Sequence, residues 1–247
     1  TPIAPRRRAL RALYSDVESA AAAVARLMAQ PVTPSMLEFM DGDCVRLARE
    51  VGGADLPPAG ALLMIEADGD DAVLDAAVAA LSAAARGPGC LDVTSAPDDA
   101  AREQLWAARK ALSPALRTLA PGKINEDVVV PVSRIPDLVA AVRRAAAAEA
   151  LTIVCFGHAG NGNLHVNILY DPAQADQVTR ADAALESVFD AVIALGGQVS
   201  GEHGIGLVKR ELLVRSLTPA TVAMMRAIKS QFDPDGLLNP GKVLPPA

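Results

Sequence analysis

All three histidines of the chain lie in two short glycine-rich motifs. His158 and His165 belong to Gly-His-Ala-Gly-Asn-Gly-Asn-Leu-His-Val-Asn, residues 157–167. His203 belongs to Ser-Gly-Glu-His-Gly-Ile-Gly, residues 200–206. Imidazoles bind divalent transition metals and exchange protons near neutral pH. Two motifs that together use every histidine of the chain therefore indicate a site for metal binding or proton transfer.

The first motif is expected to connect two strands, over residues 151–156 and 164–169. Its glycines can adopt the positive φ values of a tight reversal, which would bring His158 close to His165. Side chains alternate along a strand, so Leu164 faces the core while His165 and Asn167 face the other way. One face of the hairpin is then apolar and the other carries two histidines and an asparagine. A polar turn with surface histidines is the alternative.

The second motif adds a carboxylate, Glu202. Two imidazoles and one carboxylate are a common ligand set for a catalytic divalent metal with positions left open for substrate. Glu202 is the expected third ligand, and the adjacent His203 would be free to accept a proton. The alternative is that this glycine-rich segment is a turn that caps a helix over residues 205–213.

Hydrophobic periodicity and helix-breaking residues predict the elements that position these motifs. Helices are expected over residues 9–30, 71–85, 98–119, 135–148, 173–195 and 218–232. Strands are expected over 61–66, 91–94, 127–130, 151–156 and 164–169, with a short element over 33–40 and a turn at 41–43. This order predicts an α+β fold, an antiparallel sheet covered by helices on one side.

Composition excludes several classes of protein. The chain has 247 residues, 51% of them hydrophobic, and a net charge of −6, so it is neither disordered nor broadly basic like a nucleic-acid-binding protein. Its three cysteines have no CxxC spacing, which favours a reducing compartment over a disulfide scaffold. No transmembrane span, signal peptide or dinucleotide-binding glycine fingerprint is evident. A cytoplasmic piece of a larger protein is expected, with peripheral membrane association through an electron acceptor left open.

Three segments, residues 155–167, 200–206 and 232–242, resemble the C-terminal half of FAD-linked oxidases of the vanillyl-alcohol oxidase type. This group contains D-lactate dehydrogenases, the glycolate oxidase flavin subunit and D-2-hydroxyglutarate dehydrogenase. The resemblance implies a ferredoxin-like, substrate-binding cap domain over 1–198 and a helical C-terminal segment over 199–247 that completes the active site. It also implies an N-terminal FAD-binding domain outside this chain, so the chain alone should bind FAD weakly or not at all.

The same resemblance implies roles for individual residues. His158, His165 and Glu202 would bind a divalent metal, expected to be zinc, and His203 would be the general base. Substrate-binding positions are matched by Arg109, Ser113, Asn167 and Lys123. Strict alignment on Asp127 puts Asn125 where the family has a lysine, and Lys123 lies two residues earlier. Asn239 matches an asparagine near the flavin ring.

The implied reaction oxidises a small 2-hydroxy acid, of D configuration by resemblance, to a 2-oxo acid by hydride transfer to FAD. The implied partners are the hydroxy acid, the FAD-binding domain and an electron acceptor, with a homodimer left open and no nucleic acid. Two alternatives use the same residues differently. One is a metal-dependent hydrolase with a zinc-bound water, and the other is a non-catalytic α+β domain that binds a ligand.

Overall fold

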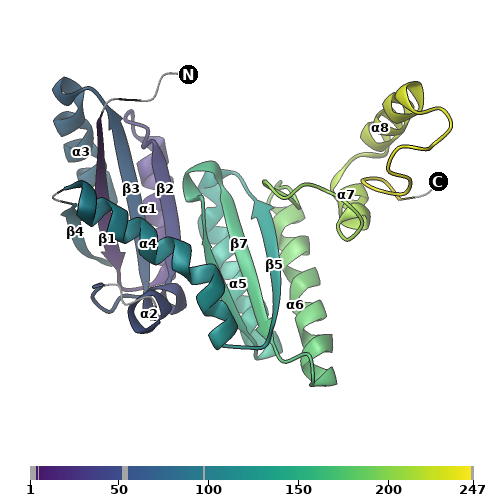
Figure 1. The fold of residues 1–247 in the computed structure, drawn as a ribbon, viewed down its shortest axis with the longest axis horizontal. Helices are drawn as coiled ribbons and strands as arrows, with labels where there is room; N and C mark the ends of the chain where they lie inside the picture. Colours follow the sequence, from purple (N-terminus) through teal and green to yellow (C-terminus); the bar gives the residue numbers. More distant parts are fainter. Residues whose placement is uncertain (1–3, 5, 52–54, 97, 246–247) are drawn as a thin grey trace.

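The strands of the described chain form one antiparallel sheet in the order β4-β1-β3-β2-β6-β7-β5 (Figure 1). The computed structural model describes residue 4 and residues 6–51, 55–96 and 98–245. The strands are β1 (Arg6–Tyr14), β2 (Met36–Asp41), β3 (Ala61–Gly69), β4 (Cys90–Ser95), β5 (Gly122–Val129), β6 (Thr152–Gly157) and β7 (Asn163–Tyr170). Neighbouring strands of this sheet are antiparallel throughout, as the predicted fold class requires.

Helices cover both faces of this sheet. They are α1 (Val17–Ala29), α2 (Gly42–Glu50), α3 (Asp71–Ala85), α4 (Asp99–Ala115), α5 (Ile135–Glu149), α6 (Ala175–Ala194), α7 (Arg210–Ser216) and α8 (Pro219–Phe232). Short 3₁₀ turns are η1 (Leu116–Thr118), η2 (Val132–Arg134) and η3 (Ala159–Asn161). The α+β prediction is confirmed, but the expectation of helices on one side only is wrong.

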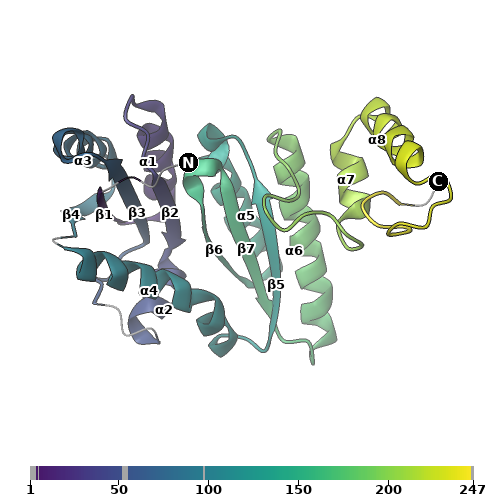
Figure 2. The same cartoon turned by 45° about the horizontal axis from the view of Figure 1, so that its top comes forward.

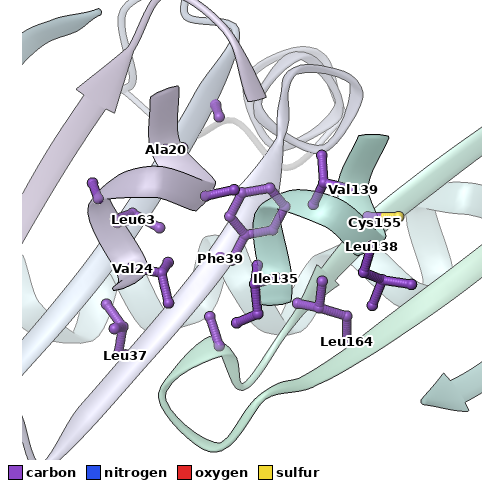
Figure 3. Close-up of a cluster of buried hydrophobic side chains, with 14 of the residues drawn as sticks. Ala20, Val24, Leu37, Phe39, Leu63, Ile135, Leu138, Val139, Cys155 and Leu164 are labelled. Carbon is purple, nitrogen blue, oxygen red and sulfur yellow. The ribbon is translucent and has the colours of Figure 1, made fainter. Parts of the chain in front are cut away.

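Each face has its own hydrophobic core. On one face, α1, α3, α5 and α6 pack over the sheet, with Phe39 fully buried among side chains of α1, α5, β6 and β7 (Figure 3). On the other face, α2 and the C-terminal part of α4 bury Leu47, Leu112 and Phe156 in a second core. The second core covers the face that carries the polar residues of the β6–β7 hairpin.

The expected helix over residues 9–30 is wrong in its first part. Residues 6–14 form β1, which pairs with both β3 and β4. The alanine-rich sequence suggested a helix by propensity, but pairing in the middle of the sheet outweighs that preference. The helix starts only after Asp16, whose side chain accepts a hydrogen bond from the Ser19 backbone N–H at 2.7 Å.

The expected turn at 41–43 is also wrong, because Asp41 is the N-cap of α2 and the helix begins at Gly42. The Asp41 carboxylate caps that helix by accepting from the Cys44 backbone N–H at 2.9 Å. Helix α3 has the predicted bounds, and α5, α6, α8, β6 and β7 lie within two residues of their predicted bounds. Strand β5 begins at Gly122, five residues before the predicted start.

The sheet consists of two halves that meet at β2 and β6. Only two residue pairs join these strands, Phe39 with Gly157 and Met40 with Phe156. Helix α4 runs across the sheet from one half to the other, and α7 and α8 lie beyond α6, away from the strands (Figures 1 and 2). None of the helices in the described part of the chain is both long and apolar enough to cross a membrane. The candidate site lies where the two halves meet.

Candidate metal and substrate site

The β6–β7 hairpin brings His158 and His165 together. Phe156 of β6 pairs with His165 of β7, and His158 follows directly where β6 ends. Gly162 closes the turn with φ +75°, and a Cβ there would lie 2.0 Å from the Val130 carbonyl oxygen. Only glycine fits this backbone without distortion. The two imidazole centroids lie 5.5 Å apart, as the motif predicts for a reversal.

A buried carboxylate on β5 holds the second motif beside the hairpin. Asp127 pairs with His165 in the sheet and is fully buried. Its Oδ2 accepts from the Ser200 hydroxyl at 3.1 Å and from the backbone N–H groups of Gly201, Glu202 and His203 at 2.9, 2.8 and 2.8 Å. Burial alone would raise the pKa of Asp127, but these donors lower it to about 2.

This contact explains why a glycine precedes Glu202. A Cβ on Gly201 would lie 2.6 Å from Asp127 Oδ1 and 2.5 Å from Asn163 Nδ2. Further along, the buried Lys209 ammonium donates to the Val199 carbonyl at 2.9 Å and pairs with Glu126 at 2.8 Å. The loop that carries Glu202 and His203 is therefore attached to β5 at both ends.

The three predicted metal ligands converge. Glu202 Oε1 lies 3.4 Å from His165 Nε2, and Glu202 Oε2 lies 3.7 Å from His158 Nε2. One ligand atom from each residue can be chosen so that all lie within 4.8 Å of one another. Ligands about 2.0–2.2 Å from a tetrahedral zinc ion lie roughly 3.3–3.6 Å apart, so this donor set fits a small divalent cation.

The arrangement leaves one side of the cluster open. The His165 side chain is 10% exposed, while those of His158 and Glu202 are 39% and 49% exposed. His203 is exposed and stacks on His165, with ring centroids 5.7 Å apart. Burial lowers the pKa of His165, which favours the neutral imidazole that a metal requires. The half-exposed side chains of His158 and Glu202 therefore leave the cluster accessible to solvent beside the His203 imidazole.

Glu38 of β2 is a member of this site that the motifs did not reveal. It is 1% exposed, contacts His158 Nδ1 through Oε1 and accepts a hydrogen bond from Arg109 Nε through Oε2 at 2.8 Å. Burial alone would raise the pKa of Glu38, but His158 and Arg109 lower it, and Glu38 in turn raises the pKa of His158. In the sequence, the sign of a functional role for Glu38 is its position as a charged residue inside the mostly apolar strand Met-Leu-Glu-Phe-Met-Asp.

The predicted substrate-binding residues differ in how close they lie to the His158–His165–Glu202 cluster. Arg109 lies near the cluster, with its guanidinium carbon 4.4 Å from the centre of the Phe156 ring. Asn167 lies two residues beyond His165 on the same face of β7 and is fully buried, and no described residue donates a hydrogen bond to its Oδ1. Lys123 pairs with Leu169, whereas Asn125 pairs with Asn167, so Asn125 lies nearer to the cluster along the sheet.

Two predicted residues are not part of this cluster's described contacts. The side chain of Ser113 lies outside the described residues, although its backbone belongs to α4. Asn239 is exposed, with φ +46°, in the segment that follows α8. Asn239 is therefore accessible to solvent in this structure.

Comparison with known proteins identifies the class. The sequence model of the family "FAD linked oxidases, C-terminal domain" matches residues 3–243, so the chain belongs to that family. The chain is 34% identical over 96% of its length to glycolate oxidase subunit GlcD of Bacillus subtilis (strain 168). It is 30% identical over 94% of its length to a probable mitochondrial D-lactate dehydrogenase of Danio rerio. It covers 51% and 47% of those two proteins, about half of each.

A third relative is named for a different hydroxy acid. The D-2-hydroxyglutarate dehydrogenase of Xanthomonas citri pv. viticola is 38% identical over 72% of the chain, which covers 38% of that protein. Among solved structures, p-cresol methylhydroxylase with substrate bound matches 99% of the chain and 54% of its own chain, with a TM-score of 0.73 and 15% identity. That similarity supports the fold.

Proposed function

We propose that this chain is the substrate- and metal-binding part of an FAD-dependent dehydrogenase that oxidises a 2-hydroxy acid, of D configuration, to a 2-oxo acid. The observation that carries the proposal is the convergence of His158, His165 and Glu202 beside an exposed imidazole. The relatives named for glycolate, D-lactate and D-2-hydroxyglutarate support the substrate class. The common feature of these substrates is a hydroxyl group next to a carboxylate.

The donor set fits zinc or a similar divalent cation, held by Nε2 of the two histidines and a carboxylate oxygen of Glu202. When bound, that cation would make the substrate hydroxyl more acidic as a Lewis acid, and FAD would accept the hydride. His203 would take the hydroxyl proton, because its imidazole stacks on the ligand His165 and an imidazole is the side chain that most often serves as a general base.

Arg109 is the proposed partner of the substrate carboxylate. Its guanidinium can form two parallel hydrogen bonds to a carboxylate, and the Phe156 ring holds it close to the hairpin. The proposed substrate positions are completed by Asn167, whose buried Oδ1 accepts no hydrogen bond from the residues that the structure describes, and by Lys123 or Asn125. Ser113 belongs to the same proposal through its place on α4.

FAD is proposed to bind mainly to an N-terminal domain that this chain does not include. Support comes from the roughly half coverage of the relatives and from the apolar surface of residues 199–247. Helix α8 has no buried residue, and Met224, Ile228 and Phe232 are 66%, 54% and 83% exposed along one stripe. Such a stripe is typical of a surface that another domain covers. We propose that residues 1–198 form the cap and that residues 199–247 bring Asn239 to the flavin.

A cytoplasmic location is part of the same proposal. The three cysteines are free, and two of them are fully or almost fully buried, as expected in a reducing compartment.

The proposal is tested on the full-length protein with an electron-accepting dye. D- and L-2-hydroxy acids of increasing size are screened for dye reduction, and metal content is measured by elemental analysis. We expect turnover of a D-2-hydroxy acid that is lost on chelation and restored by a divalent cation. Hydrolysis of esters or amides without dye reduction would instead favour a metal-dependent hydrolase.

A further inference from the structure

We propose that Glu38 is a positioning residue that links metal binding to substrate binding: one buried carboxylate orients both the metal ligand His158 and the substrate arginine Arg109. This inference rests on the proposed function. It adds a residue from β2, in the half of the sheet that contains neither histidine motif.

The sheet register brings Glu38 to His158. Phe39 pairs with Gly157 in the antiparallel β2–β6 contact, so the residue before Phe39 lies opposite the residue after Gly157. The β2–β6 contact is short, which leaves His158 outside the strand and its ring free to turn toward Glu38. Glu38 Oε1 contacts His158 Nδ1.

This contact selects the nitrogen that faces the metal. A carboxylate that accepts a hydrogen bond from Nδ1–H fixes the tautomer with its lone pair on Nε2. Nε2 of His158 is the atom that lies 3.7 Å from Glu202. The same contact makes the imidazole a better donor to a cation, and removal of such a partner costs about 10–100-fold in metal affinity.

The second oxygen of Glu38 acts on Arg109. It accepts from Nε at 2.8 Å, and the guanidinium lies over Phe156. A guanidinium has five N–H donors, so the bond from Nε leaves the four on the two terminal amino groups to bind a substrate carboxylate. Because one side chain contacts both groups, its removal should weaken cation and substrate binding together.

The chain contains a matched control in Glu66 of β3. Glu66 is also a glutamate in the interior of the sheet, 4% exposed, and lies 3.7 Å from both Arg7 and Arg102. The described contacts of Glu66 include two arginines but no imidazole. A general effect of neutralising a buried glutamate should appear in both variants, whereas an effect through His158 should appear only at Glu38.

The experiment uses the full-length FAD-containing protein with Glu38→Gln and Glu66→Gln variants. Zinc affinity is measured by competition with a chromophoric chelator, and KM and kcat with the D-2-hydroxy acid that gives the highest turnover. We expect Glu38→Gln to weaken zinc binding about 10–100-fold and to raise KM, with Glu66→Gln unchanged in both. Equal zinc affinity in wild type and Glu38→Gln, or an equal loss in Glu66→Gln, would overturn the inference.

A measurement on the wild type does not depend on the variant folding. In zinc-loaded protein with labelled histidine, nitrogen NMR should identify His158 as protonated at Nδ1 and metal-bound at Nε2. Metal on Nδ1 would overturn the role of Glu38 but leave the proposed function intact. Absence of bound zinc in the wild type would overturn the proposed function and this inference with it.

Discussion

Replacing Asp127 by asparagine should release the loop that carries Glu202 and His203. The carboxylate accepts four hydrogen bonds from this loop through one oxygen and is fully buried. Asparagine keeps the shape of the side chain but removes the negative charge and introduces an N–H₂ group. In one orientation of the amide, this group would face four hydrogen-bond donors.

The size of the effect follows from the number of bonds. A hydrogen bond to a charged group contributes about 1.5–3 kcal/mol and a neutral one about 1 kcal/mol, so loss of the charge should cost roughly 0.5–2 kcal/mol for each bond. Because the four donors share one oxygen, the free-energy contributions of their hydrogen bonds do not add fully. The expected loss of unfolding free energy in Asp127→Asn is therefore about 2–4 kcal/mol. For a chain of this length that corresponds to a decrease in Tm of roughly 5–15 °C.

Two assays on the full-length protein test this reasoning. Urea denaturation should give the loss of unfolding free energy, and chelator competition should show weaker metal binding because Glu202 is no longer held beside the hairpin. Asp182→Asn is the control, because it makes the same substitution at an exposed position of α6. Unchanged stability together with unchanged metal affinity in Asp127→Asn would refute the role assigned to this carboxylate.

Three further outcomes are expected. The pKa of Asp127 is lowered to about 2, so its stabilisation should be complete above about pH 4 and lost as pH falls toward 2; a stability difference between wild type and Asp127→Asn that stays constant from pH 5 to 2 would contradict this. Tyr14→Phe removes the buried hydrogen bond from the hydroxyl to the Ala85 carbonyl and should cost about 1–2 kcal/mol in urea denaturation, with metal content unchanged. His203→Ala in the full-length protein should slow flavin reduction by about 10²–10⁴-fold while the metal stays bound. Flavin reduction at the wild-type rate in His203→Ala would show that another group takes the proton.

The β6–β7 hairpin was predictable because its information is local. His158 and His165 are separated by one glycine-rich turn, and alternation along a strand is enough to assign their faces. The sequence indicated that Glu202 could be a ligand, but it could not place Glu202 beside the hairpin. That placement depends on hydrogen bonds from the loop to Asp127, seventy-five residues earlier. No local pattern connects those two positions.

Glu38 shows the same limit more clearly. Glu38 and His158 are 120 positions apart and are brought together by the pairing of β2 with β6, and a single sequence gives no register for such a pairing. The first strand was missed for a related reason. Residues 9–14 are flanked by an alanine-rich helix, and only pairing with β3 and β4 makes them a strand. Long-range pairing was also what placed Asn125, rather than Lys123, opposite Asn167.

The most direct test of the central claim is the metal content of the purified full-length protein and of its ligand variants. We expect about one divalent cation for each chain in the wild type, and a loss of at least tenfold in His158→Ala, His165→Ala and Glu202→Ala, because each removes one of the three converging donors. Exposed Glu211→Ala serves as the control and should retain the cation. Wild-type metal content in all three ligand variants would contradict the account.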